Sequence, residues 1–236
     1  MAKVAAKFAK IAAKIAKVAK MTRITINMRV SMNNRNSLRQ AVRQRRNLLT
    51  TNDQQNASIK LTRQLSTHCK IKLAQHIAIY LANDGELDPV NFIHWCWQQG
   101  KQVYLPVIHP FSQGNLLFIH YHKASVMVMN KYGILEPKLD VRYVLPVNKI
   151  DVLCTPLVAF DQTGSRLGMG GGFYDRTLAA WHQQYQGQAQ ISAKPYPIGL
   201  AHDCQLVDGI ESELWDIPLP EIITPLYRYS CIAMNG

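Results

Sequence analysis

A chain of 236 residues, 47% hydrophobic and 18% charged, has the composition of a globular protein and enough length to bury a substantial core. Because no apolar run reaches the roughly 18 residues that span a bilayer, and no secretory signal is present, we expect neither a membrane-spanning nor an exported protein. The five cysteines are scattered and form no CxxC pair, which predicts reduced thiols in a cytoplasmic protein and no cysteine-based metal site.

The formal net charge of +12 is concentrated at the N-terminus. Residues 1–20 contain six lysines and no acid, and the remaining 21 bases and 15 acids leave a charge of +6. High positive charge is typical of proteins that bind nucleic acid or membrane surfaces. This distribution instead favours a moderately basic body that handles polyanionic small molecules. The alternative function is that of a non-enzymatic module that binds nucleic acid or a membrane surface. The evidence for it is the charge of the N-terminal segment.

The first 20 residues, MAKVAAKFAKIAAKIAKVAK, predict a separate amphipathic helix. Val4, Phe8, Ile11, Ile15 and Val18 recur at spacings of four and three, and the intervening alanines favour helix. The regular lysine–alanine repeat is typical of an appended peptide. A membrane-surface helix and an integral helix of the fold are the alternatives.

Residues 21–34 are predicted to link this helix to a single α/β domain over residues 35–236. Helices are expected over residues 34–49, capped by Asn36 or Ser37, and over about residues 58–70. Further along the chain, strands are expected at 76–82, 102–108, 116–122, 150–160 and 196–202, and helices at 88–100 and 175–186. This alternation predicts a three-layer sandwich with a mainly parallel, Rossmann-like sheet, in which 116–122 can begin an antiparallel excursion.

The segment GSRLGMGGGFYDR, residues 164–176, contains five of the 13 glycines. It follows the most hydrophobic predicted strand and precedes a predicted helix, and open α/β sheets bind ligands at the carboxyl ends of their strands. Glycines let backbone N–H groups approach phosphate oxygens, and a helix N-terminus attracts negative charge. The segment is therefore predicted to bind phosphate, with a cation from Arg166 and a magnesium ligand from Asp175. A flexible surface loop is the alternative.

This segment lacks the Gly-Lys-Ser/Thr ending of a Walker loop and the third glycine of the dinucleotide-binding fingerprint. Instead, AFDQTGSRLGMGGGFYDRTL closely resembles the signature of the 5-formyltetrahydrofolate cyclo-ligases, also called 5,10-methenyltetrahydrofolate synthetases. Other segments resemble elements of that family and follow in the family's order, namely RNSLRQAVRQRR, IYLANDGELDP, YGILEP and ELWDIPL. The resemblance covers about residues 35–224.

The resemblance implies a ligase that converts 5-formyltetrahydrofolate to 5,10-methenyltetrahydrofolate while ATP becomes ADP and phosphate. The formyl oxygen would take the γ-phosphoryl group to give an imino-phosphate, from which a neighbouring amine displaces phosphate. Such an enzyme mainly aligns its reactants and neutralises charge. ATP is then the co-substrate, Mg²⁺ the metal and a folate, with or without a polyglutamate chain, the partner. The domain is expected to act as a monomer, without nucleic acid or membrane.

The resemblance also implies roles for single residues. Arg166 and Tyr174 are expected to be catalytic, and Asp175 and Asp216 to bind the metal. The folate is expected to contact Leu81, Glu86, Tyr132 and Glu136. The residues expected to bind ATP are two arginines of the N-terminal basic helix and the residues of the glycine-rich segment, namely Arg35, Arg39, Arg166, Leu167, Gly168, Met169, Gly170, Gly171, Gly172, Phe173 and Tyr174.

Several positions depart from the family's pattern, among them Met169 and Gly171, which stand where some members carry basic residues. Arg35 stands where lysine is usual, which keeps the charge but changes how a phosphate is held. Trp215 precedes Asp216 where histidine or asparagine is common, so nearby Glu213 is a substitute metal ligand. A different nucleotide-using enzyme, such as a small-molecule kinase, is the remaining alternative for the same glycine-rich segment.

Overall fold

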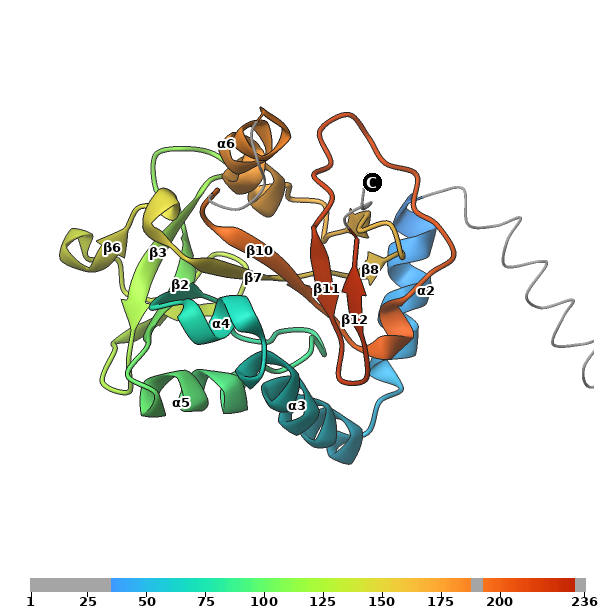
Figure 1. Cartoon of the computed structure of the whole chain (residues 1–236), viewed down its shortest axis with the longest axis horizontal. Coiled ribbons are helices and arrows are strands. Elements are labelled where there is room, and N and C mark those ends of the chain that lie inside the picture. Colours follow the sequence, from blue (N-terminus) through green and yellow to red (C-terminus); the bar gives the residue numbers. More distant parts are fainter. Residues whose placement is uncertain (1–34, 188–192, 232–236) are drawn as a thin grey trace, which may run out of the picture. The chain divides into compact units, whose positions relative to one another are not determined.

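The computed structural model describes residues 35–187 and 193–231 (Figure 1), so the predicted amphipathic helix and linker at residues 1–34 lie outside the described residues. The chain divides after Gln40 into two compact units, and each is described by itself. The boundary falls inside helix α2 (Arg35–Asn47). Asn36 and Ser37 already belong to this helix, so the predicted cap at these residues is wrong.

The second unit is built on an eight-stranded sheet in the order β12-β11-β10-β7-β1-β2-β3-β6. Its four central pairings are parallel and its outer pairings antiparallel. This confirms the mainly parallel sheet and the antiparallel excursion at 116–122. The strands are β1 (His76–Ala78), β2 (Gln102–Ile108), β3 (Leu116–Tyr121), β6 (Val144–Leu145), β7 (Val152–Pro156), β10 (Tyr196–Leu200), β11 (Glu221–Ile223) and β12 (Arg228–Ser230).

Two hairpins and several helices surround this sheet. The hairpins are β4 (Met127–Met129) with β5 (Leu135–Pro137), and β8 (Ala159–Phe160) with β9 (Arg166–Leu167). The α-helices are α3 (Thr51–Ser66), α4 (Cys69–Leu73), α5 (Val90–Gln98) and α6 (Phe173–Gly187). Short 3₁₀ helices are η1 (Val141–Tyr143), η2 (Val147–Lys149) and η3 (Asp203–Gln205).

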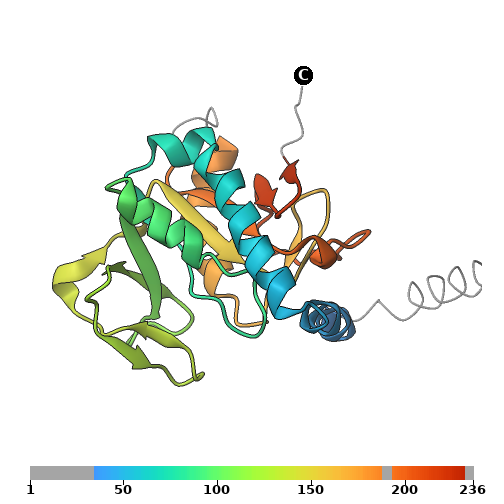
Figure 2. The same cartoon turned by 90° about the horizontal axis from the view of Figure 1, so that it is seen from below.

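Successive residues of the central strands face opposite layers, because side chains alternate along a strand. One buried cluster joins α3, α4 and α5 to the sheet through Leu61, Ile71, Phe92, Ile77, Val103 and Val152. The opposite cluster joins α6 to the sheet through Ala78, Tyr104, Leu153, Leu178 and Trp181. Figures 1 and 2 show α3, α4 and α5 on one side of the sheet and α6 on the other, which confirms the predicted three layers.

Helix α3 begins at Thr51 rather than near Ser58, because a reciprocal cap starts it. The Thr50 hydroxyl accepts a hydrogen bond from the Asp53 N–H, and the Asp53 carboxylate accepts one from the Thr50 N–H at 2.9 Å. The first turns are polar and exposed, so the hydrophobic pattern alone does not reveal them. The predicted helix also extends too far, since the structure divides it into α3 and α4.

Two central strands are shorter than predicted. β1 ends at Ala78 and β7 at Pro156, although apolar residues continue beyond both. The segments that follow leave the sheet at its carboxyl edge. All five cysteines are free. Among the described residues, no helix has both the length and the apolar character needed to cross a membrane.

Candidate functional site

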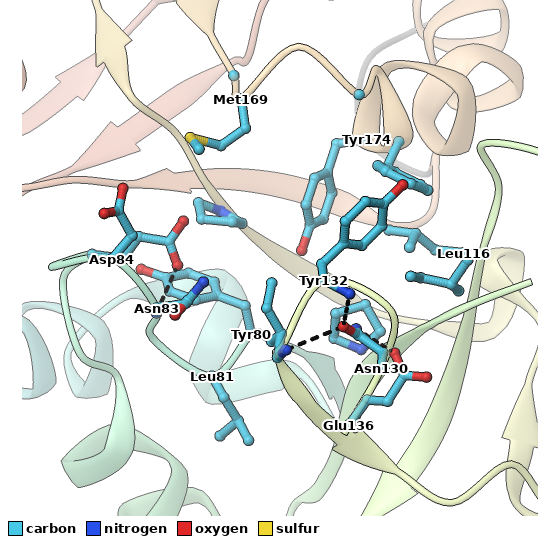
Figure 3. A pocket seen from close by; sticks show the side chains of 18 of the residues that line it. Tyr80, Leu81, Asn83, Asp84, Leu116, Asn130, Tyr132, Glu136, Met169 and Tyr174 are labelled. Carbon is cyan, nitrogen blue, oxygen red and sulfur yellow. Dashed lines mark hydrogen bonds between the residues drawn. The ribbon is translucent and has the colours of Figure 1, made fainter. Parts of the chain in front are cut away.

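A pocket of about 500 Å³ lies at the carboxyl ends of β1, β2 and β7. The chain runs from β1 to β2 on one side and later to β7 on the other, and such a switch point is where open α/β sheets bind ligands. Figure 3 shows side chains converging on it from several loops. The predicted residues that line it are Leu81, Glu86, Tyr132, Glu136, Arg166, Gly168, Met169, Gly171, Gly172, Phe173, Tyr174 and Asp175.

One wall of the pocket is the segment Gly168–Gly172, which we call the glycine loop. It connects β9 to the N-terminus of α6 at Phe173. Gly170 and Gly172 have φ angles of 97° and 62°, a backbone conformation in which a side chain would be strained. A Cβ at Gly172 would also approach the Arg176 guanidinium to 2.8 Å. The sequence thus places bare backbone beside a helix N-terminus, where N–H groups suit an anion.

Arg166 and Asp175, which stand on either side of the glycine loop in the sequence, form an ion pair. Its side chain is buried and donates a hydrogen bond to Asp175 Oδ1 at 2.7 Å and another to the carbonyl of Ile217. Asp175 Oδ1 also accepts from the Ile217 N–H at 3.3 Å. Burial lowers the pKa of Arg166, and the charges of Asp175 and Asp216 oppose that shift. The arginine is therefore an internal cation that reaches the pocket wall from a fixed position.

Arg176 holds the glycine loop from the outside. Its Nε donates to the carbonyl of Gly114 at 2.8 Å, and its guanidinium donates to the carbonyl of Gly171. The loop between β2 and β3 is thereby connected to the glycine loop. Because Arg176 is exposed, these contacts are expected to contribute less than the buried ion pair of Arg166.

The opposite wall is the turn Asn83–Glu86, which we call the Asp84 turn. The Glu86 N–H donates to the Asn83 carbonyl at 3.0 Å, and the Asn83 N–H donates to Glu86 Oε2 at 3.1 Å. Asp84 and Gly85 have φ angles of 50° and 73°, the signs that a type I′ turn requires at its two central residues. Burial raises the pKa of the Glu86 carboxyl to about 7, despite the opposing charge of Arg46.

The β4–β5 hairpin forms a third wall. Asn130 organises its tip, since its side-chain oxygen accepts from the N–H groups of Tyr132 and Ile134 at 2.9 and 3.1 Å. Its amide donates to Glu136 Oε2 at 2.9 Å, so Asn130 holds that carboxylate beside the tip of the hairpin (Figure 3). The Tyr132 ring meets the edge of Phe173, with ring centres 6.3 Å apart. The hairpin thus reaches the beginning of α6.

Other predicted residues lie elsewhere. Leu167 is buried in β9, and the pocket lining includes neither Leu167 nor Gly170. Arg35 and Arg39 belong to the first unit, so their part in the site stays a prediction. Asp216 accepts from the Glu213 N–H at 2.9 Å. Among residues 35–187 and 193–231, no group of three or more His, Cys, Asp or Glu side chains is arranged to hold a metal.

Sequence reasoning missed several lining residues, namely Tyr80, Asn83, Asp84, Asn130 and Pro156. One signal was readable: Asp-Gly is a preferred pair for a type I′ turn, and it follows the predicted strand at 76–82 directly. Asn130 carries no comparable signal, because its role depends on a hairpin that no pattern predicts.

A model of the family described as "5-formyltetrahydrofolate cyclo-ligase family" matches residues 31–225. A protein of Escherichia coli (strain K12) named 5-formyltetrahydrofolate cyclo-ligase is 53% identical over 184 residues, covering 78% of this chain and 96% of that protein. A protein of the same name from Haemophilus influenzae is 44% identical over 189 residues, covering 80% and 96%.

Two solved structures share the fold. The NMR structure of Aquifex aeolicus 5,10-methenyltetrahydrofolate synthetase matches with a TM-score of 0.70 and 23% identity, covering 86% of this chain and 95% of that one. A 5,10-methenyltetrahydrofolate synthetase from Mycoplasma pneumoniae matches with a TM-score of 0.61 and 23% identity, covering 81% and 99%.

Proposed function

The chain belongs to the 5-formyltetrahydrofolate cyclo-ligase family and is a ligase, and on this premise we propose that it converts 5-formyltetrahydrofolate to 5,10-methenyltetrahydrofolate while ATP is converted to ADP and phosphate. The observation that carries the proposal is a single pocket with two unlike walls. The glycine loop offers backbone N–H groups and a helix N-terminus, and the Asp84 turn offers the Glu86 carboxyl. A phosphate donor and an N–H-rich ring system suit these walls respectively.

The chemistry explains why both ligands are needed together. An amide oxygen is a poor leaving group, so the formyl oxygen first bonds to the γ-phosphorus as the bond to ADP breaks. The neighbouring folate amine then bonds to the formyl carbon and loses its proton, and phosphate leaves with the former formyl oxygen. The protein's part is to align acceptor and donor and to stabilise negative charge.

The glycine loop and its neighbours serve the ATP side. Gly168, Gly171 and Gly172 line the pocket, and backbone N–H groups of such a loop suit phosphate oxygens. Arg166, reaching the wall from its buried position, places positive charge where the γ-phosphoryl group moves. Tyr174 lines the same wall, and burial raises the pKa of its hydroxyl, so it acts as a neutral hydrogen-bond donor. Arg35 and Arg39 are proposed to add charge from the basic helix.

The donor set around Arg166 fits the proposed Mg²⁺. This ion commonly takes one or two carboxylates and completes its shell with substrate phosphates and water. Asp175 lines the pocket, and both Asp175 and Asp216 act electrostatically on Arg166. When bound, the ion would neutralise phosphate charge. Because Asp175 Oδ1 already accepts two hydrogen bonds, the metal-binding role falls to the other oxygen of that carboxylate.

The Asp84 turn and the β4–β5 hairpin serve the folate side. Glu86 would accept hydrogen bonds from the N–H edge of the pterin, as Leu81 and Tyr132 pack against its rings. Glu136, held by Asn130, borders the same space. We extend the proposal to polyglutamylated folate as substrate and to a monomeric enzyme.

The experiment that tests the proposal is an assay of ADP release with and without 5-formyltetrahydrofolate. We expect ADP release to require the folate and to match 5,10-methenyltetrahydrofolate formation mole for mole. ADP release that proceeds with other acceptors and without methenyl product would instead indicate a kinase on the same loop.

A further inference from the structure

The most unusual buried group of the second unit is the guanidinium of Arg46. Its side chain is 1% exposed, although arginine is almost never buried to this extent. Nη2 donates to the Asp84 carbonyl and, at 2.7 Å, to Asp84 Oδ2. The other two nitrogens, Nε and Nη1, are buried and have no hydrogen-bond partner among the residues that the structure describes. Burying unmatched N–H groups costs stability, so this arginine requires an explanation other than stability.

The position of Arg46 suggests a functional explanation, because its guanidinium is in contact with the Asp84 turn. A Cβ built on Gly85 would stand 3.7 Å from Arg46 Nε and 3.2 Å from the side-chain oxygen of Asn47. Asp84 is also the one residue other than glycine, among those described, with a positive φ. An aspartate in this conformation persists when its surroundings hold it there.

Two further contacts close the frame around the turn. The Tyr80 hydroxyl donates to the Leu87 carbonyl at 2.7 Å, which joins the residues on either side of the turn. Gln54 of α3 donates to the Gly85 carbonyl at 3.3 Å. Of the two described arginines that pair with Asp84, Arg46 is buried and Arg43 is partly exposed, and the charge of Arg46 also acts on Glu86.

We propose that Arg46 is a positioning residue for the folate site: by binding both the carbonyl and the carboxylate of Asp84, it holds the Asp84 turn in the conformation that directs Glu86 into the pocket. The inference rests on the proposed function, since it takes Glu86 as a folate ligand. Arg46 itself does not line the pocket and acts through Asp84. Its cost in stability is explained by this function.

The first test is to measure 5-formyltetrahydrofolate and ATP binding separately, by calorimetry on the full chain, for wild type and Arg46→Met. Methionine has similar length and removes the buried charge, while Asp84 keeps its second partner, Arg43, at 2.8 Å. We expect the Kd for the folate to rise about 10- to 100-fold, the loss expected when a buried N–H group of the ligand no longer meets its acceptor. The Kd for ATP should not change, and the melting temperature should not fall.

The matched control is Arg142→Met, which breaks an arginine–aspartate pair of 2.6 Å at an exposed site. It should change neither affinity. Asp84→Asn is the second variant, because asparagine also tolerates a positive φ but removes the ion pair. It should weaken folate binding in the same direction, and it keeps the proposal testable if Arg46→Met does not fold.

The decisive arm combines Arg46→Met with Glu86→Gln. If Arg46 acts through Glu86, it should add less than about two-fold to the folate Kd once Glu86 is replaced, because coupled residues are non-additive. A full additional loss in the double variant would overturn the inference, as would an Arg46→Met chain that binds folate like wild type. A wild-type chain that does not bind 5-formyltetrahydrofolate would overturn both this inference and the proposed function.

Discussion

The two main walls of the pocket present their binding groups in opposite ways. The glycine loop presents backbone, with two glycines at positive φ, whereas the Asp84 turn presents the side chain of Glu86. Yet each wall rests on a buried arginine that donates to an aspartate: Arg166 to Asp175, and Arg46 to Asp84. Both walls are thus supported by the same kind of contact, a buried arginine paired with an aspartate. They differ in the group that would bind the ligand, and this difference matches the chemistry of each proposed ligand. N–H donors suit phosphate, and a carboxylate suits an N–H edge.

The largest effect on turnover and stability is expected when the ion pair between Arg166 and Asp175 is broken. Asp175→Asn leaves the buried Arg166 without its charged partner, and breaking such a pair costs about 3–5 kcal/mol. It also removes a proposed metal ligand, so turnover should fall at least about 100-fold. Thermal melting and turnover over a magnesium titration measure the two losses. The exposed pair offers a matched control, Asp140→Asn. Unchanged turnover and magnesium dependence would show that this wall does not depend on the pair.

On the opposite wall, Glu86→Gln should weaken folate binding while leaving ATP binding nearly intact. A buried N–H edge that loses its carboxylate acceptor costs about 1–3 kcal/mol. Calorimetry with each ligand alone measures this. If the affinity for folate is unchanged, Glu86 does not bind the folate and the comparison between the walls fails.

The raised pKa of Glu86 sharpens the same prediction. Only the ionised carboxylate accepts from the pterin edge with both oxygens, and below pH 7 the free protein holds Glu86 increasingly protonated. The folate Kd should therefore rise as pH falls below about 7, by up to about ten-fold per pH unit. Glu86→Gln should flatten this dependence. A wild-type Kd that does not change between pH 6 and 8, values taken about one unit either side of that pKa, would contradict the assignment.

Smaller effects are expected when methyl groups are added to the glycine loop. Gly172→Ala places a side chain at positive φ, at a cost of about 1–2 kcal/mol, and its Cβ would crowd Arg176. Gly168→Ala is the matched comparison, because its Cβ meets nothing within 4 Å. We expect kcat/KM for ATP to fall several-fold more in Gly172→Ala than in Gly168→Ala. Equal effects would mean that backbone conformation is not what this wall contributes.

The smallest effect is expected for Arg176→Gln. Its hydrogen bonds to the glycine loop are exposed, and contacts of this kind contribute about 0–1 kcal/mol. kcat/KM for ATP should therefore fall by less than about five-fold, with folate binding unchanged. A larger loss would mean that the exposed Arg176, rather than the buried Arg166, mainly stabilises the glycine loop.

Much of this arrangement was readable from sequence, and the reasons differ between the walls. The glycine loop was predicted because glycines between an apolar strand and a helix leave a local signature. The mainly parallel sheet and the antiparallel strand at residues 116–122 were predicted from the alternation of strands and helices along the chain. The predicted strand at 76–82 ended early, since hydrophobicity does not reveal where a chain leaves the sheet.

The contacts of Arg46 and Arg166 that support the walls of the pocket could not be predicted from the sequence. In the sequence Arg46 is one of five arginines between residues 35 and 46, and only the fold brings it into contact with Asp84, nearly 40 positions away in the chain. Arg166 was expected to contact phosphate, but its pairing with Asp175 and Ile217 depends on the return of the C-terminal segment. Contacts between distant segments have no local pattern, so a single sequence carries no sign of them.

The most direct test of the central claim is a crossed binding measurement with two variants and two ligands. ATP and 5-formyltetrahydrofolate affinities are measured separately, by calorimetry, for Gly172→Ala and Glu86→Gln. The account predicts that Gly172→Ala weakens only ATP binding and that Glu86→Gln weakens only folate binding. If either variant weakens both ligands equally, or if the pairing is reversed, the two walls do not have the separate roles assigned to them.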